Sequence, residues 1–137
     1  MKIKYLPHTA DIRMLIEGES LQKLFLAGLK GMANILKEGV CEHTYKFNSK
    51  TRINISSLDY TNLLVDFLSE VLSHTYANKT IYCKVNIITL EKYSIVADIF
   101  GLETNGFDEE IKAVTYHEAE VKKNKKNLWQ TCIIFDI

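Results

Sequence analysis

A chain of 137 residues, 47% hydrophobic and 25% charged, has the size and composition of one globular domain, which we expect to span residues 1–137. Seventeen basic residues balance seventeen acidic ones, which excludes a general electrostatic attraction to DNA, RNA or a membrane surface. No apolar run approaches the roughly 20 residues of a membrane span, and the N-terminus does not read as a signal peptide. The three cysteines are odd in number and widely spaced, so we expect neither a disulfide framework nor a structural zinc site. These features favour a protein of the reducing cytoplasm.

The only proline of the chain lies between two short segments that are typical of strands, residues 3–6 and 11–17. The loop between them has the sequence Pro7-His8-Thr9-Ala10-Asp11, and its carboxylate stands where the second strand begins. Two interpretations of Asp11 are open. It either presents an oxygen ligand at the end of a strand or closes an Asx-type turn on its own backbone.

Two helices follow from the spacing of apolar residues. Ser20 is the expected N-cap of the first helix, which runs to about residue 36, and Gly28 and Gly31 within it indicate close packing on a neighbouring element. The second helix begins after Asp59 and carries a wide apolar stripe. Its acidic residues Asp66 and Glu70 are four apart, and we interpret them as part of a solvated face in preference to a carboxylate pair.

The remaining segments predict strands. They are residues 52–57, residues 80–90 and 93–100 with a tight turn at 91–92, and a final hairpin of residues 111–121 and 128–137. Residues 101–108 read as a loop that carries Glu103 and Asp108. Four lysines at the tip of the final hairpin either contact phosphate or keep the hairpin soluble, and we favour solubility. The predicted class is α+β, with two helices packed on mainly antiparallel β-sheet in a single compact domain.

The end of the chain is the most informative feature for chemistry. Residues 133–135 are a continuous apolar run, followed at once by Asp136 and the terminal carboxylate of Ile137. Two adjacent anions held by a buried strand repel each other, and a bound cation offsets that cost. Asp11 would supply a third oxygen, and such a ligand set suits a hard cation such as Ca²⁺ or Mg²⁺. The sequence alone leaves open whether these strand ends meet.

Three segments, taken in order, resemble the signatures of the archease family: residues 8–11 (HTAD), residues 111–117 (IKAVTYH) and the terminal residues 135–137 (FDI). Residues 63–70 are also similar to the leucine-rich helix of that family. The resemblance implies a small protein that promotes the guanylylation and turnover of the GTP-dependent RNA ligase of tRNA splicing and is not itself an enzyme. RNA would be reached through the ligase, and neither DNA nor a membrane is an expected partner.

The resemblance also implies particular residues. The family's metal site maps onto Asp11, Asp136 and the carboxylate of Ile137, with Ca²⁺ as the expected ion and Mg²⁺ or Mn²⁺ as alternatives. Lys112 and His117 are carried over as residues for ligase activation. In an unbroken strand these two side chains point to opposite faces, so a bulge or loop is needed if both serve one site.

Two departures from the family pattern concern the surface around this site. Arg13 stands where the family usually has glycine, and the loop before the lysine motif reads Gly101-Leu102-Glu103 in place of Gly-Glu-Pro.

Two other classes of function compete with an activator: an independent metal-dependent phosphoester hydrolase, and a metal-free scaffold for protein or RNA. No Ser-His-Asp order, phosphate loop or zinc-protease motif is present, and the hydrolase lacks an evident general base near Asp11 other than His8. We expect His8 to support Asp11 by hydrogen bonding rather than to act as that base.

Overall fold

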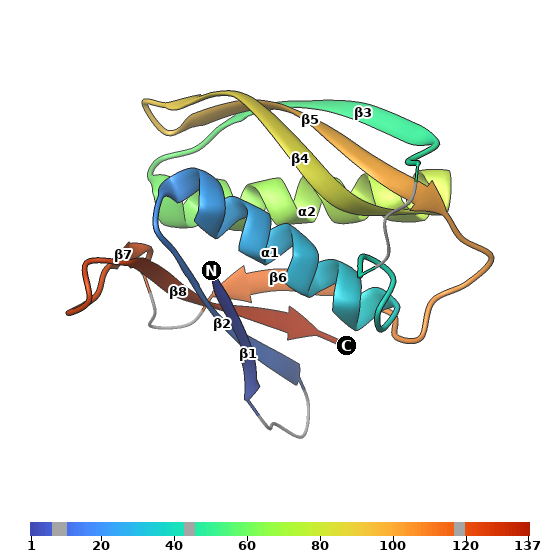
Figure 1. Ribbon diagram of the computed structural model, residues 1–137, viewed down its shortest axis with the longest axis horizontal. Coiled ribbons are helices and arrows are strands. Elements are labelled where there is room, and N and C mark those ends of the chain that lie inside the picture. The colour runs from blue at the N-terminus through green and yellow to red at the C-terminus, as the bar shows by residue number, and fades with distance from the viewer. Residues whose placement is uncertain (7–10, 43–45, 117–119) are drawn as a thin grey trace.

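The fold has two antiparallel sheets with two helices between them (Figure 1), as seen in a computed structural model that describes residues 1–6, 11–42, 46–116 and 120–137. The elements in chain order are β1 (Lys2–Leu6), β2 (Asp11–Gly18), α1 (Leu21–Leu36), β3 (Ser49–Ser56), α2 (Tyr60–Asn78), β4 (Thr80–Glu91), β5 (Ser94–Glu103), β6 (Ala113–Tyr116), β7 (Lys122–Lys123) and β8 (Trp129–Asp136). The α+β class is confirmed, and the antiparallel strands form two sheets where the sequence analysis described one.

Sheet A contains β1, β2, β8 and β6 in that order, and β7 also pairs with β8. Sheet B has the order β3-β5-β4. Each sheet turns one face toward the helices and the other away from them (Figure 1). The core therefore lies in the helical layer, where apolar side chains of both sheets and both helices meet.

Both helices begin where the sequence predicts. The Ser20 side chain accepts a hydrogen bond from the Lys23 N–H at 3.1 Å, and Asp59 accepts one from the Asn62 N–H at 2.7 Å. Gly31 permits the close packing that its sequence suggests, since a Cβ there would overlap the Met14 side chain of β2. Local capping signals thus fix where the two helices begin.

Three predicted boundaries in the second half of the chain are wrong. The turn between β4 and β5 is centred on Lys92 and Tyr93, whose φ angles are 50° and 59°. The strand β5 continues to Glu103, which is paired with Thr80 and does not belong to a loop. Of the long strand predicted over residues 111–121, the described part of the chain contains only β6 (Ala113–Tyr116), and β7 begins after it at Lys122.

The cysteine prediction is also wrong, because Cys41 and Cys83 form a disulfide bond. They are 42 residues apart, and β4 brings Cys83 next to the segment that follows α1. Spacing in the sequence gave no signal for this contact, so the cysteines no longer favour a reducing compartment. In the described residues no helix is both long and apolar enough to span a membrane.

Candidate functional site

The candidate site is built where β2 begins and β8 ends. Asp11 is the direct cross-strand partner of Asp136, and Ala113 of β6 pairs with Asp136 from the other side. Cross-strand partners share one face of a sheet, with Cβ atoms about 4.5–5.5 Å apart. The next residue inward, Phe135, is fully buried against the helices, so both carboxylates belong to the face that points away from them. The structure therefore brings together two residues that are 125 positions apart in the sequence.

The neighbouring row on this outer face adds a cation. Arg13 pairs with Ile134, which pairs in turn with Thr115, and these side chains line a cavity of about 390 Å³ together with Asp11 and Asp136. Arg13, which replaces the glycine usual at this position of the motif, thus faces the same cavity as the carboxylates. The cavity is therefore lined by two negative groups and one positive group. Carboxylates are ligands for a hard metal ion, and a guanidinium can hold a phosphate.

The side chain and the α-carboxylate of Ile137 have different surroundings. Its side chain is partly buried and packs on the core cluster, which holds the last residue of the chain against sheet A. Its α-carboxylate follows directly on Asp136. The described residues contain no group of three or more His, Cys, Asp or Glu side chains able to hold a metal ion. A metal at Asp11 and Asp136 would therefore need a further ligand, and the terminal carboxylate, which follows directly on Asp136, is the candidate named by the sequence analysis.

Lys112 is positioned through its backbone. Its N–H donates to the Asp136 carbonyl oxygen at 2.7 Å, so the lysine stands beside the acidic strand end. The preceding residue, Ile111, is held by Tyr76 of α2, whose hydroxyl accepts from the Ile111 N–H at 2.7 Å and donates to its carbonyl oxygen at 2.9 Å. Burial raises the pKa of Tyr76, which keeps that hydroxyl protonated for the second bond. Phe107 packs edge-on against the tyrosine ring with centroids 5.4 Å apart.

The sequence analysis did not place Tyr76 at the candidate site. Its role in holding Ile111 was missed because the two residues are 35 positions apart. The predictions for His8 and His117 lie outside the described residues, and so does the question of whether Lys112 and His117 serve one site. Because β6 spans only Ala113–Tyr116, Lys112 precedes the strand and the parity argument for an unbroken strand does not apply to it.

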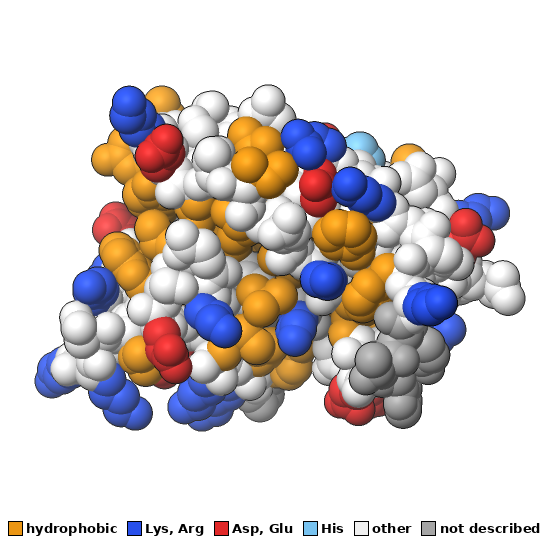
Figure 2. Space-filling view, turned by 45° about the horizontal axis from the view of Figure 1, so that its top comes forward, with side chains coloured by type: hydrophobic (Ala, Val, Ile, Leu, Met, Phe, Trp, Pro, Cys, Tyr) orange, Lys and Arg blue, Asp and Glu red, His pale blue; other side chains and the backbone are white. Residues whose placement is uncertain are grey.

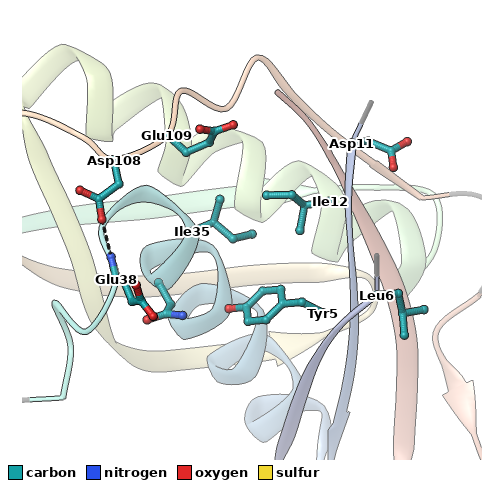
Figure 3. A pocket seen from close by; sticks show the side chains of 9 residues that line it. Tyr5, Leu6, Asp11, Ile12, Ile35, Glu38, Asp108 and Glu109 are labelled. Atoms are coloured by element: carbon teal, nitrogen blue, oxygen red, sulfur yellow. Dashed lines mark hydrogen bonds between the residues drawn. The ribbon is translucent and has the colours of Figure 1, made fainter. Parts of the chain in front are cut away.

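A second cavity, of about 560 Å³, adjoins Asp11 on the helical side (Figure 3). Its centre is apolar, with Ile12 and Ile35 pointing toward each other from β2 and α1, and its edge carries acidic side chains (Figure 3). The acidic residues that line it are Asp11, Glu38, Asp108 and Glu109. Asp11 thus contributes to both cavities and lies between them.

Asp108 has a structural explanation. Its N–H donates to the Leu36 carbonyl oxygen at 2.7 Å, and its carboxylate accepts from the Glu38 N–H at 3.0 Å (Figure 3). It therefore ties the end of α1 to the segment leading to Lys112. Glu103, the other acidic residue predicted in this loop, belongs to sheet B and does not line the cavity.

The remaining candidates behave as ordinary surface groups. Asp66 accepts a hydrogen bond from the Ser57 hydroxyl at 2.6 Å, and Glu70 pairs with His74 at 3.3 Å, as expected for a solvated helix face. Cys132 lies on the outer face of β8, where burial raises the pKa of its thiol, so it is protonated at neutral pH and is a poor nucleophile.

Comparison with known proteins matches the archease protein family to residues 4–137 of this chain. The archease of Methanosarcina mazei is 32% identical over 146 residues, covering 99% of this chain and 96% of its own. The archease of Pyrococcus abyssi is 27% identical over 137 residues, covering 95% and 94%. Two solved structures show the same fold. The first is the solution structure of a Methanobacterium thermoautotrophicum protein, with a TM-score of 0.74, 22% identity and 98% of both chains covered. The second is the crystal structure of a Thermotoga maritima protein described as an archease and possible chaperone, with a TM-score of 0.61 and 18% identity, covering 100% of this chain and 98% of its own.

Proposed function

The chain belongs to the archease family, and we propose that it is a non-catalytic, metal-binding activator of a GTP-dependent RNA-splicing ligase, which it helps to become guanylylated and to turn over in tRNA splicing. The observation that supports this proposal most strongly is the cross-strand pairing of Asp11 with Asp136. Each stands at the end of a central strand of sheet A, and together with the terminal carboxylate they would form one site there.

The residues present fit a divalent cation. Like charges directly opposite each other in a sheet are destabilising, and a cation between them removes that cost. Asp11, Asp136 and the carboxylate of Ile137 offer only oxygen donors, which favours Ca²⁺, with Mg²⁺ or Mn²⁺ as alternatives. When bound, such an ion would supply charge neutralisation for the phosphates that the ligase handles.

Lys112 would act beside this site as a second positive group. It is exposed, and its backbone is fixed both by Asp136 and, through Ile111, by Tyr76. A fixed backbone with a mobile ammonium is suited to contact a partner's phosphate or carboxylate without a change of fold. His117 is retained in the proposal as a further residue for activation, and His8 as support for Asp11.

The experiment that tests the proposal is multiple-turnover ligation of RNA with a 2′,3′-cyclic phosphate end by the partner ligase, with and without this protein. We expect the protein to raise the number of turnovers and the fraction of ligase that is guanylylated. A variant with Lys125→Ala and Lys126→Ala at the exposed tip between β7 and β8 serves as the control and should stimulate fully.

The same assay without ligase separates the activator from a hydrolase. Incubation of the protein alone with GTP and the RNA should leave both unchanged. Turnover of either substrate in the absence of ligase would contradict the activator and favour the metal-dependent hydrolase. Full stimulation in the presence of a chelator would favour a metal-free scaffold.

A further inference from the structure

The outer face of sheet B carries an aromatic ring between two lysines. Phe100 of β5 pairs with Lys50 of β3 on one side and with Lys84 of β4 on the other, so the three side chains form one row across the sheet. The ammonium nitrogens lie 5.9 Å (Lys50) and 5.4 Å (Lys84) from the centre of the ring. Both lysines are exposed and Phe100 is partly exposed, so the whole row is accessible from solvent.

The adjacent row adds an oriented guanidinium. Arg52 donates from Nε to Asp98 Oδ1 at 2.5 Å and from its Nη2 to Oδ2 at 3.3 Å, which fixes the plane of its side chain on the sheet. The Asp98 side chain is only 9% exposed, whereas those of Arg52 and Lys50 are 58% and 60% exposed. Lys50 Nζ also lies 3.7 Å from Asp98 Oδ2. The solvent side of these two rows therefore presents three cations, and the carboxylate that pairs with two of them lies below.

No helix in the described residues covers this face, because α1 and α2 both lie on the other side of sheet B (Figure 1). The buried residues Ile53, Ala97 and Ile99 point from the same strands toward the helices. Figure 2 brings the side of sheet B forward and shows lysine and arginine side chains spread among apolar ones. The outer face of sheet B around Phe100 is thus locally basic, although the net charge of the chain is zero.

We propose that the outer face of sheet B binds a single-stranded segment of RNA, with a base stacked on Phe100 and phosphates held by Lys50, Lys84 and Arg52. Aromatic rings on an open sheet flanked by cations bind single strands, since every base has a face that can stack and every nucleotide carries a charge. The lysines that now flank the ring have long, exposed side chains, so they can exchange contact with the ring for contact with a phosphate.

The central aromatic ring distinguishes RNA from an acidic polypeptide. An acidic polypeptide would bind the lysines and the arginine through its carboxylates, but those carboxylates would make no use of the Phe100 ring at the centre of the row. This inference rests on the proposed function in one respect. With RNA on sheet B and the ligase at the Asp11 and Asp136 site of sheet A, the protein would contact enzyme and substrate together. The test below uses no ligase, so its failure would leave the activator proposal standing.

The experiment is fluorescence anisotropy of labelled oligouridylate with the protein alone, at several salt concentrations. Binding should weaken as salt rises, by about 0.7 in the slope of log K against log salt for each phosphate neutralised on a single strand. Lys84→Ala should reduce that slope by about 0.7. Phe100→Leu should weaken binding about tenfold without changing the slope, and Phe100→Tyr should restore it, because only the aromatic variants allow stacking.

Three outcomes would overturn the inference. The first is no binding at low salt by a protein that melts normally. The second is loss of binding in the Lys125→Ala, Lys126→Ala variant with no loss in Phe100→Leu, which would place RNA at the hairpin tip. The third is competition by polyglutamate equal to that by unlabelled oligouridylate, which would identify the occupant as an acidic polypeptide. Melting curves of Phe100→Leu and Lys84→Ala should match that of the unaltered protein, because both side chains lie on the solvent face.

Discussion

Sheets A and B differ in the signs of the charged residues that face each other across their strands. At one end of the two central strands of sheet A, the register sets Asp11 directly opposite Asp136, two groups of the same sign. On the outer face of sheet B the register sets Arg52 opposite Asp98, two groups of opposite sign joined by hydrogen bonds. Both arrangements are imposed by buried apolar residues on the other face of each strand. The like-charged pair is a candidate for binding a cation, whereas in the opposite pair the carboxylate of Asp98 is neutralised and the guanidinium of Arg52, 58% exposed, stays accessible to a phosphate.

Asp11→Asn should have the largest effect on activity. The substitution keeps the shape of the side chain and removes the charge that the proposed cation requires, so stimulation of the ligase should fall to the level without the protein. With chelator present the fold should be as stable as before, or more stable by about 0.2–1 kcal/mol, because repulsion with Asp136 is relieved. Ligation assays and thermal melting measure the two effects.

The control for Asp11→Asn is Glu91→Gln, which neutralises an exposed carboxylate at the end of β4 in sheet B. It should stimulate normally. A large fall in melting temperature of Asp11→Asn with chelator would assign Asp11 to a structural turn and remove the contrast between the sheets.

Lys112→Ala should have the second largest effect on ligase stimulation. We expect stimulation to fall about tenfold, the size of one lost charge-assisted contact, with metal affinity nearly unchanged because Lys112 contacts Asp136 only through its backbone. Stimulation is measured at saturating metal and metal affinity by calorimetry. If metal affinity collapsed together with stimulation, the lysine would belong to the architecture of the metal site.

Tyr76→Phe should have a smaller effect on activity than Lys112→Ala. It removes the hydroxyl that holds the N–H and carbonyl of Ile111, at a cost of about 1–3 kcal/mol in the free energy of unfolding. Stimulation should fall in part, because Lys112 loses one of its two supports. Tyr60→Phe at the start of α2 is the matched control, and an equal loss of stimulation in both variants would argue against a positioning role for Tyr76.

Arg52→Gln should have the smallest effect, and one that depends on pH. Arg52 holds the pKa of Asp98 below its ordinary value of 3.8, so the pair stabilises the fold fully above that value and loses its contribution as pH falls through the lowered pKa. The variant should melt at a slightly lower temperature than the unaltered protein at neutral pH, with the difference shrinking in strong acid. A difference that grew as pH fell would contradict the ion pair.

The sequence predicted those parts of the fold that depend on near neighbours. Ser20 and Asp59 cap helices within three residues of themselves, and apolar spacing extends the first helix to its end at Leu36. It also placed Asp11 and Asp136 at strand ends. What it left open was the register that joins those ends, since pairing of β2 with β8 depends on contacts across nearly the whole chain.

The failures have the same physical origin. The disulfide between Cys41 and Cys83, and the support of Ile111 by Tyr76, are contacts between residues more than thirty positions apart. The turn after β4 was displaced by one residue because Lys92 and Tyr93 adopt positive φ without a glycine to signal it. The outer face of sheet B was missed because its lysines and its phenylalanine come from three different strands.

The central claim is that the carboxylates at the end of sheet A hold a cation, and the most direct measurement is a calcium titration by calorimetry of the native protein and of a protein extended by one C-terminal glycine. The extension moves the terminal charge about 3.5 Å along the chain and leaves a neutral carbonyl after Ile137, while the packed side chain is retained. If these carboxylates hold a cation, the extended protein will bind calcium more weakly and stimulate the ligase less, with equal melting temperatures in chelator. Equal affinity and equal stimulation would contradict this claim and remove Ile137 from the site.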